Sequence, residues 1–383
     1  MKKLLVVVNN RANYARIKTV LIEANKSKKI QLIIVVAASG ILDRYGDVVK
    51  MMRKDRLKVS YKINTIVEGQ SLNTMAKSTA LSILELSTIF DQCKPDIVFT
   101  IADRFETIAA AIAGSYMNII VAHSQGGEVT GSIDESVRHS ITKLAHIHFP
   151  STKKSFERLI RLGEERKRIF LTGCPAMDLA YKTKKKITQN FVKKYQGVGY
   201  KVDYKKPYIT VLQHPNTLEY GEGLHQINET LKAMDLLDMQ IVWIWPNIDA
   251  GSNEISKGLR MFREKNKKKN KKFCFVKNFT PEDYIRLLYN SSCVVGNSSS
   301  TIRECSALGI PSVCIGTRQS GRESGHNVMF SKYSYKDIYK KTLSQISHGK
   351  YKPQKIFGDG SAGKKIVKAL EKFNINIHKK LTY

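Results

Sequence analysis

Three carboxylates in the first half of the chain follow short apolar segments. Asp103 comes after residues 95–100, Glu128 comes after residues 118–123, and Asp134 follows a few residues later. Carboxylates that lie near one another split their pKa values, so that one can hold a proton while another accepts one. The three are candidates for general acid and base chemistry. Two structural alternatives remain open: Asp103 could pair with Arg104, and Asp134 could stabilise the start of a helix.

The second half of the chain contains a segment suited to an anion. Residues 294–296 are apolar or glycine, Ser298, Ser299, Ser300 and Thr301 carry hydroxyl groups, and Glu304 follows. This order predicts a buried strand, a tight turn and a helix start whose backbone N–H groups attract phosphate. Glu304 would stand one turn into the helix, where a carboxylate can accept hydrogen bonds from a ribose. An ordinary capped helix after a strand is the alternative.

Other polar residues follow the remaining apolar segments. In the first half they are Arg11, Asn13, Arg104, Glu106, Gln125, Gly126 and Gly127; in the second half they are His214, Asn247, Asp249, Arg318 and Arg322. The two late arginines suit bidentate phosphate contacts, or they lie on a solvated loop. The histidine could contact phosphate, donate a proton or be structural. The glycines either admit a ligand or make a turn.

Two histidines alternate on one segment as metal ligands can. They are His146 and His148, and no cysteine or acidic residue stands at ligand spacing from them. We therefore interpret them as structural, and the sequence predicts no metal site.

Strands and helices alternate along the whole chain. Strands are expected at residues 4–8, 30–37, 95–100, 118–123, 146–149, 208–212, 240–245, 273–276, 293–295 and 312–315. Helices are expected at residues 15–24, 71–92, 106–116, 132–145, 152–162, 223–234, 255–264, 281–291 and 301–308. Such alternation indicates parallel sheets covered on both faces, whose ligands lie at the carboxyl ends of the strands. The sequence predicts an α/β protein with two doubly wound, Rossmann-like domains and a cleft between them.

The domain boundaries follow from composition. Residues 1–180 would form the first domain, which carries the candidate carboxylates, and residues 207–360 the second, which carries the anion-binding segment. The basic, weakly apolar stretch 181–206 is typical of a link. Residues 361–383 contain an expected helix at 364–372, which would pack back on the first domain.

The chain is strongly basic, with a formal net charge of +31 over 383 residues. Nucleic-acid or membrane-surface binding would account for such a charge. The lysines are spread along the chain, however, with one charged run at residues 265–272 and no aromatic interleaving. We favour a solvated basic surface that partly serves to attract an anionic substrate, with no nucleic-acid or membrane partner.

Cysteine usage and the N-terminus bear on the compartment. The six cysteines include no C-x-x-C pair, and the apolar run at residues 4–8 is short for a signal peptide or a membrane span. A reducing, cytoplasmic location is expected.

Taken together, these residues resemble the UDP-N-acetylglucosamine 2-epimerase family, and within it the hydrolysing branch that makes N-acetylmannosamine for sialic-acid-type sugars. The matching motifs are NRANY at 10–14, DRFE at 103–106, HSQGGE at 123–128, SIDESVRH at 132–139, TKL at 142–144, HP at 214–215, PNIDAG at 246–251, GNSS at 296–299, RE at 303–304, GTRQ at 316–319 and IFGDG at 356–360. They span nearly the whole chain. No sugar-kinase half, which the bifunctional animal enzyme carries, is present in this sequence.

The resemblance implies a glycosyltransferase-B-like fold, a homo-oligomer (dimer or tetramer), and no cofactor or metal. It implies a UDP-sugar substrate whose UDP is held by Arg11, Arg104, His214, Asn247, Gly296, Asn297, Ser298, Ser299, Glu304 and Arg318. The catalytic set it implies is Asp103, Gln125, Glu128, Asp134 and His214. The family eliminates UDP across C1–C2 to give a glycal and then adds water with inversion at C2, which needs a proton shuttle and charge neutralisation at the diphosphate.

One departure from the family pattern affects the proton chemistry. The family commonly has Glu where this chain has Gln125, and glutamine cannot take a proton. The proton transfer would then pass to Asp103, Asp134 or Glu128, the substrate would differ, or activity would be low. A non-hydrolysing 2-epimerase, a GT-B glycosyltransferase and a catalytically weak UDP-sugar binder are the alternative functions.

Overall fold

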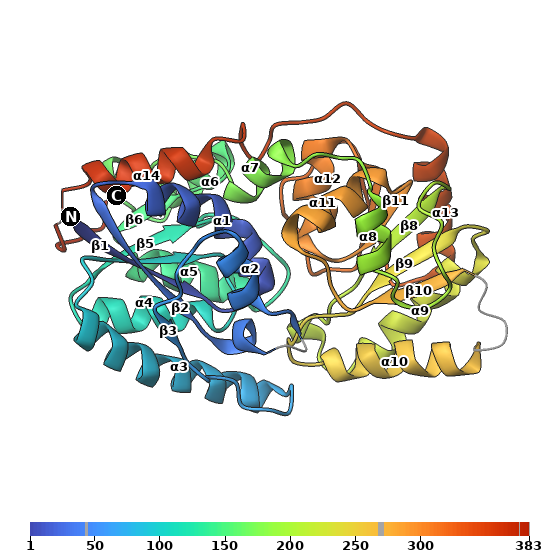
Figure 1. Cartoon of the computed structure of the whole chain (residues 1–383), viewed down its shortest axis with the longest axis horizontal. Helices are drawn as coiled ribbons and strands as arrows, with labels where there is room; N and C mark the ends of the chain where they lie inside the picture. The colour runs from blue at the N-terminus through green and yellow to red at the C-terminus, as the bar shows by residue number, and fades with distance from the viewer. Residues whose placement is uncertain (43–44, 267–271, 375, 383) are drawn as a thin grey trace. The chain divides into compact units, whose positions relative to one another are not determined.

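The computed structural model describes residues 1–383 except 43–44, 267–271, 375 and 383. The lysine-rich run predicted at residues 265–272 therefore lies mostly outside the described residues. The chain divides into two compact units (Figure 1). Unit 1 comprises Met1–Val129, Ile133–Leu179 and Phe357–Tyr383, and unit 2 comprises Thr130–Ser132 and Ala180–Ile356. Among the described residues, no helix has the length and apolar character needed to span a bilayer.

Unit 1 is built on a six-stranded parallel sheet. The strands are β1 (Lys2–Val8), β2 (Ile30–Val36), β3 (Tyr61–Lys62), β4 (Ile97–Ile101), β5 (Ile120–Ser124) and β6 (Ile147–Phe149). They run in the order β3-β2-β1-β4-β5-β6, so the chain reverses direction across the sheet after β3. This order is that of a doubly wound fold, whose ligands lie at the carboxyl ends of the strands beside the reversal, here β1 and β4.

The helices of unit 1 cover both faces of its sheet. They are α1 (Arg11–Lys26), α2 (Val48–Lys54), α3 (Leu72–Cys93), α4 (Thr107–Tyr116), α5 (Asp134–Leu144), α6 (Lys153–Arg161) and α14 (Ala362–Lys372), with α7 (Pro175–Lys182) leading into unit 2. Along β1, Leu4 and Val6 pack with α1 and α14, whereas Leu5 and Val7 pack with α3 and α4. A strand buried on both faces needs the continuous apolar run that the sequence shows.

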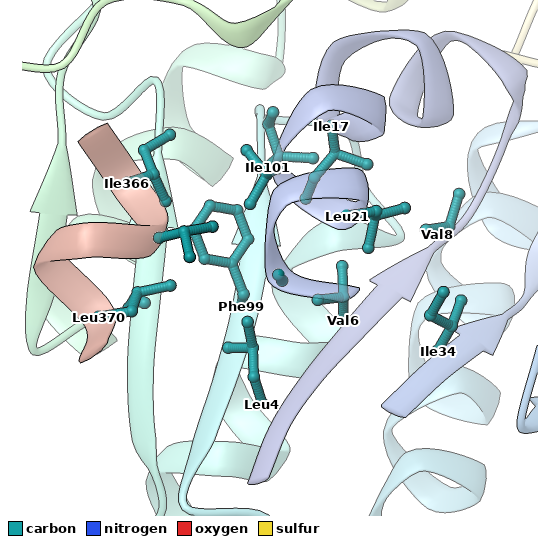
Figure 2. Close-up of a cluster of buried hydrophobic side chains, with 14 of the residues drawn as sticks. Leu4, Val6, Val8, Ile17, Leu21, Ile34, Phe99, Ile101, Ile366 and Leu370 are labelled. Atoms are coloured by element: carbon teal, nitrogen blue, oxygen red, sulfur yellow. The ribbon is translucent and has the colours of Figure 1, made fainter. Parts of the chain in front are cut away.

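The last helix of the chain is part of the unit 1 core. Figure 2 shows Ile366 and Leu370 of α14 beside Phe99 of β4, with Leu21 of α1 in the same cluster. Ile366 and Leu370 are at most 1% exposed. The helices α1 and α14 lie against each other, and Gly363 approaches Thr19 so closely that a Cβ would sit 2.9 Å from its carbonyl carbon.

Unit 2 is built on a seven-stranded sheet. The strands are β7 (Val198–Gly199), β8 (Tyr208–Leu212), β9 (Gln240–Ile244), β10 (Phe273–Val276), β11 (Cys293–Gly296), β12 (Ser312–Ile315) and β13 (Val328–Ser331). Their order is β13-β12-β11-β8-β9-β10-β7, and only the short edge strand β7 runs antiparallel. The switch of direction lies between β8 and β11, where the order again predicts a ligand site.

The helices of unit 2 also pack on both faces of its sheet. They are α8 (Gln189–Lys194), α9 (Gly223–Leu236), α10 (Ser252–Lys265), α11 (Pro281–Asn290), α12 (Arg303–Leu308) and α13 (Tyr335–His348), with 3₁₀ turns η4 (Thr217–Glu219) and η5 (Ser299–Thr301). Val295 packs with α9 and α10, and its neighbour Val294 packs with α11 and α12. The predicted fold class, two Rossmann-like parallel sheets, is confirmed.

The structure differs from the sequence prediction in two places that bear on the site. The first helix begins at Arg11 rather than residue 15, because Asn10 caps it by accepting a hydrogen bond from the Asn13 amide at 2.8 Å. Residues 181–206, which composition suggested to be a link, carry α8 and β7 and pack in unit 2. Phe191 and Tyr195 pack there against the ring of Phe279. Because these few aromatic residues stand among many lysines, the composition of the stretch did not reveal that it packs in unit 2.

A buried carboxylate joins the two distant segments that complete unit 1. Asp178 of α7 accepts hydrogen bonds from the amides of Ala362 and Gly363, at 2.9 and 2.7 Å, and so satisfies the first turn of α14. We expect Asp178→Ala to lower the free energy of unfolding of unit 1 by about 1–3 kcal/mol, since two buried donors lose their acceptor. Urea titration followed by circular dichroism measures this effect.

Two controls accompany the Asp178 experiment. Both tryptophans, Trp243 and Trp245, lie in unit 2, so their fluorescence should report an unchanged transition. The matched variant is Asp359→Ala, which removes an exposed carboxylate that bonds Ser361 and Lys365 near the same helix start, and we expect a cost under about 1 kcal/mol. An equal loss for both variants would contradict the capping role of Asp178.

Candidate functional site

The carboxyl end of β4 places Asp103 against a buried arginine. Asp103 is 5% exposed, and Arg138 of α5 is fully buried. Arg138 Nε donates to Asp103 Oδ2 at 3.0 Å, and Nη2 contacts the same oxygen. The sequence suggested a local pair with Arg104, and the structure adds a guanidinium that helix α5 brings from 35 residues further along the chain.

Arg138 joins two further groups near the candidate carboxylates. Its Nη1 donates to the Glu128 carbonyl at 2.9 Å and to Glu135 Oε2 at 2.6 Å. Burial alone would lower the pKa of Arg138, but the negative charges of Asp103 and Glu128 outweigh burial and raise it. Asp134 stands at the first position of α5, one turn before Arg138, and Glu128 is 3% exposed. Unit 1 thus gathers Asp103, Glu128 and Glu135 around one permanent positive charge, with Asp134 one turn earlier on the same helix.

The second residue of the DRFE motif has a partner of its own. Arg104 Nε donates to Glu106 Oε1 at 2.9 Å, and the same oxygen accepts a hydrogen bond from Asn10 Nδ2 at 2.9 Å. Because Asn10 also caps α1, Glu106 ties the end of β4 to the helix on which Arg11 is the first residue. Glu106 is 1% exposed, and through these two hydrogen bonds it holds Arg104 and the start of α1 in place.

Gln125 stands in a backbone conformation that non-glycine residues seldom adopt. Its φ is +72°, and its amide donates to the Phe149 carbonyl at 3.0 Å. Ala102, the residue before Asp103, has φ +68° and donates from its amide to Ser124. Left-handed non-glycine residues cost free energy and cluster at functional sites. Two of them at neighbouring strand ends show backbone strain at this edge of unit 1, where the candidate residues lie.

The Gln125 side chain lies inside unit 1 rather than at its surface. The residue is 1% exposed, and Nε2 donates to Cys174 Sγ at 3.1 Å. Its Oε1 is buried and has no hydrogen-bond partner among the described residues. A buried acceptor without a donor is costly, so a polar group of a ligand or a water would stabilise it.

The paired glycines after Gln125 serve packing more than ligand access. Gly127 has φ +75°, and a Cβ there would lie 2.2 Å from the Ser155 carbonyl oxygen of α6. Gly126 faces His123 Nδ1 and Thr142 Oγ1, at 3.1 and 3.2 Å from the position of a Cβ. Position 127 therefore has no room for a side chain against α6, and a side chain at position 126 would be tight against His123 and α5.

A fully buried histidine hydrogen-bonds the backbone next to Asp103. His123 Nε2 lies 2.9 Å from the Ala102 carbonyl oxygen, and burial lowers the pKa of His123 to about 4. The ring is thus neutral near pH 7, with the hydrogen on Nε2 so that it can donate to the carbonyl. His146 and His148 also stay within unit 1: His146 Nδ1 accepts from the Val121 amide, and His148 lies 2.9 Å from Glu164.

We predict a pH dependence of stability that belongs to His123. In the unfolded chain the ring binds a proton below about pH 6.5, whereas the folded chain excludes that proton until about pH 4. The unfolded state binds more protons in this window, so stability falls as pH decreases. In urea titrations between pH 5 and 6.5, His123→Gln should flatten the slope by up to about 1.4 kcal/mol per pH unit. An unchanged slope would show that His123 is protonated in the folded protein.

In unit 2, the side-chain amide of Asn297 fixes the end of β11 to the end of β8 through two hydrogen bonds to His214, which we call the latch. Asn297 Oδ1 accepts from the His214 amide at 2.7 Å, and Asn297 Nδ2 donates to the His214 carbonyl at 2.8 Å. Asn297 is fully buried. Gly296 before it has φ +137°, and a Cβ there would lie 2.0 Å from the Leu212 carbonyl oxygen. The Asn297 side chain thus serves to position His214, whereas the sequence suggested direct contact with a ligand.

The latch brings a third strand end into the same place. His214 Nδ1 accepts a hydrogen bond from the Asn247 amide at 3.2 Å, so in the neutral ring the hydrogen is on Nε2. The Asn247 side chain bonds Asp249 through Nδ2, and its Oδ1 accepts from the Asp249 amide at 3.2 Å. His214 and Asn247, predicted from separate motifs, are therefore adjacent.

The hydroxyl-rich turn after Asn297, where the sequence predicted an anion site, is capped by its own serine. Ser298 caps η5, and its Oγ accepts from Ser300 Oγ at 2.9 Å. Glu304 follows in the first turn of α12, where its Oε2 is buried with no hydrogen-bond partner in the described part of the chain. Because Ser300 and Thr301 bond within the turn, Ser298, Ser299 and Glu304 remain as the half-buried polar edge. The structure divides the predicted helix start into a 3₁₀ turn and a six-residue helix.

The loop after β12 adds positive charge beside this turn. Arg318 donates from Nη1 to the Asn297 carbonyl at 3.3 Å, and its Nη2 lies 3.6 Å from Asp249 Oδ2. Gln319 Nε2 donates to the same carbonyl at 3.0 Å, and its Oε1 accepts from Arg322 at 2.8 Å. Arg322 is 8% exposed, so the solvated-loop alternative does not hold for it. Unit 2 thus combines a capped turn, a carboxylate, an imidazole and a guanidinium at four strand ends.

Sequence reasoning missed the residues that position the others. Arg138, Gln319 and His123 all lay within recognised motifs, but the sequence analysis assigned none of them a role. A usable signal existed for Arg138, because Asp134, Glu135 and Arg138 have the spacing at which helical side chains meet. No comparable local signal marks His123 or Gln319, whose partners are backbone carbonyls of other segments.

Two Rossmann-like units, each with polar residues gathered at the carboxyl ends of parallel strands, define a protein of the GT-B-like structural class. The chain belongs to the UDP-N-acetylglucosamine 2-epimerase family, whose model matches residues 22–371. A relative from Neisseria meningitidis, named UDP-N-acetylglucosamine 2-epimerase, is 30% identical over 361 residues, which cover 94% of this chain and 92% of that protein.

Two further comparisons extend this result. A relative from Legionella pneumophila, named UDP-N,N'-diacetylbacillosamine 2-epimerase (hydrolyzing), is 30% identical over 97% of this chain and 96% of that protein. Among solved structures, the Neisseria meningitidis UDP-GlcNAc 2-epimerase bound to UDP-GlcNAc matches with a TM-score of 0.77 at 19% identity, covering 97% of this chain and 100% of that one. At that identity the structural match supports the fold alone.

Proposed function

We propose that this protein is a hydrolysing 2-epimerase, which converts UDP-GlcNAc or a close acetamido-sugar analogue and water into the ManNAc-type sugar and UDP. The observation that carries the proposal is the end-to-end similarity to the Legionella relative, whose name specifies a hydrolysing reaction on a diacetamido sugar. Such a product would supply sialic or nonulosonic acid synthesis.

In this proposal unit 2 holds the nucleotide. Ser298 and Ser299 bind the diphosphate at the capped turn, and Arg318 neutralises its charge. Glu304 accepts the ribose hydroxyls through the oxygen that is buried without a hydrogen-bond partner in the described part of the chain. His214 and Asn247 line the same strand ends, and Gly296 and Asn297 shape them. Arg11 and Arg104 of unit 1 are the further cationic groups assigned to the UDP.

The chemistry is assigned to the carboxylates of unit 1. A base removes the C2 proton while the C1–oxygen bond breaks, so that UDP leaves with the bonding electrons and a glycal remains. Water then adds across the double bond: hydroxyl joins C1, and a proton reaches C2 from the opposite face. Asp103, Glu128 and Asp134 are the candidate groups that can exchange protons, and Gln125 can only donate or accept hydrogen bonds. The sum of the steps consumes one water and changes no oxidation state overall.

Product analysis tests this assignment. Incubation with UDP-GlcNAc in D₂O, followed by NMR, should show free UDP and ManNAc that carries deuterium at C2. The 2,4-diacetamido-6-deoxy analogue is the parallel substrate, because the Legionella relative's name refers to it. Intact nucleotide sugars after prolonged incubation with both would refute the proposal.

A non-hydrolysing 2-epimerase is the second candidate. The observation that favours it is the name of the Neisseria relative, which carries no mention of hydrolysis and has the same 30% identity. This activity would yield UDP-ManNAc in equilibrium with UDP-GlcNAc and no free UDP. The same NMR experiment separates the two reactions.

The division of labour between the units makes a quantitative prediction. Asp103→Asn and Asp134→Asn should each lower kcat by roughly 10²–10⁴-fold, the usual contribution of general acid–base groups. The affinity for UDP, measured by calorimetry, should change less than about twofold, because most of the residues assigned to UDP lie in unit 2. In Asp103→Asn the new amide oxygen can still accept from Arg138, which limits misfolding. Equal losses of turnover and of UDP affinity would count against this separation of roles.

Gln125→Glu tests the departure from the family pattern. If a missing carboxylate limits the native enzyme, kcat toward UDP-GlcNAc should rise, by about 10-fold or more for a recovered acid–base group. If the glutamine belongs to a different proton path, kcat should fall while UDP affinity is retained. Cys174→Ala is the matched control, because it removes the neighbour that receives the Gln125 amide hydrogen and adds no charge. A Gln125→Glu enzyme with unchanged kinetics would exclude Gln125 from the reaction.

A further inference from the structure

The C-terminal segment of the chain caps the helix that carries the catalytic groups. The ammonium of Lys379 donates to the carbonyls of Thr142, Lys143 and Ala145 at 2.9, 2.9 and 2.8 Å. These carbonyls end α5 and have no partner within the helix. A cation at a helix C-terminus is favourable, and three hydrogen bonds fix it there. The other end of α5 carries Asp134, and its middle carries Arg138.

The same ammonium belongs to a buried ion cluster. Lys379 Nζ lies 2.7 Å from Glu164 Oε2, and the side chain of Glu164 is fully buried. Lys143 Nζ reaches Glu164 Oε1 at 3.0 Å, and His148 Nε2 lies 2.9 Å from Oε2. Burial would raise the pKa of Glu164, but His148 and Lys379 outweigh it and lower the pKa to about 2. Glu164 is thus ionised at neutral pH, and removal of Lys379 takes away a main countercharge.

This cluster continues to the Asp103 loop. His148 on β6 is paired in register with His123 on β5, and His123 bonds the Ala102 carbonyl beside Asp103. Residues on adjacent strands therefore lead from the C-terminal segment through Glu164 and His148 to His123 and the strand end beside Asp103. Its second branch is α5 itself, which reaches Asp103 through Arg138.

Other contacts hold the C-terminal segment in this place. Arg168 donates to the Asn376 carbonyl at 3.0 Å and to the His378 carbonyl. The Thr382 amide donates to the Gly163 carbonyl at 3.0 Å, and Leu381 packs so close to Gly163 that a Cβ there would lie 2.6 Å from it. Backbone hydrogen bonds thus hold this segment against unit 1 and keep Lys379 at the C-terminal end of α5.

We propose that Lys379 is a positioning residue for the 2-epimerase reaction: it fixes the C-terminal end of α5 and the Glu164 cluster, and thereby the geometry of Asp103, Asp134 and Arg138. This inference rests on the proposed function. It assigns the C-terminal segment a function in turnover beyond its contribution to the core of unit 1. Lys379 contacts no group assigned to the substrate, so its effect is on kcat.

The test compares Lys379→Met with Lys380→Met in the full chain. Lys380 is the exposed neighbour and has the same side-chain type. Lys379→Met should lower kcat by about 10- to 100-fold, as a small misplacement of catalytic groups does. KM and UDP affinity should change less than about twofold, because unit 2 is untouched. Lys380→Met should leave all three unchanged.

A merely structural role predicts a different result. In that case Lys379→Met would lower the melting temperature but leave kcat intact at temperatures where the protein is folded, and this outcome overturns the proposal. Equal losses with Lys380→Met would also overturn it. If Lys379→Met fails to fold, Lys379→Gln keeps an amide donor for the carbonyls, and the same kcat loss at unchanged KM is expected of it.

Failure of the proposed function is distinguishable from failure of this inference. If the wild-type protein turns over neither nucleotide sugar, the reaction assignment is wrong. Positioning is then read by hydrogen exchange: Lys379→Met, but not Lys380→Met, should speed exchange by about tenfold or more in peptides from α5 and from residues 100–106. Unchanged exchange in those peptides overturns the inference whatever the substrate is.

Discussion

The fully buried guanidinium of Arg138 fixes the positions of the segments that surround it in unit 1. Arg138 has no exposed surface, so its charge is stable only while carboxylates and carbonyls surround it. The end of β4, the loop after β5 and the first turn of α5 each supply one of these partners: Asp103, the Glu128 carbonyl and Glu135. Loss of one partner of a buried ion pair typically costs about 3–5 kcal/mol. The positions of the candidate catalytic groups are therefore coupled to the folding of the unit.

Unit 2 fixes its strand ends mainly through the amide groups of Asn297 and Gln319. Asn297 exchanges two bonds with the backbone of His214, and its own carbonyl accepts from Arg318 and Gln319. Parallel strands end at one edge of a sheet, which brings the loops near one another, but the latch fixes their mutual distances.

Much of this could be predicted from the sequence for physical reasons. Continuous apolar runs such as residues 4–8 can only be strands covered on both faces, and their alternation with helical segments implies doubly wound sheets. Hydroxyl residues after such a run imply a capped turn, as Ser298 shows. Short or aromatic elements escaped this prediction: β7 has two residues, and α8 is stabilised by ring contacts of Phe191 that no periodicity reveals.

The sequence by itself determined the strand ends, the residue types at them and the family, because these depend on local pattern and on motifs contiguous in the chain. Only the tertiary structure decided which groups pair. Asp103 meets Arg138 of α5, the Asn297 side chain serves His214, and Lys379 returns from the end of the chain to cap α5. Such choices depend on which partner remains within about 3 Å once water is excluded, and that distance is a property of the packed chain alone.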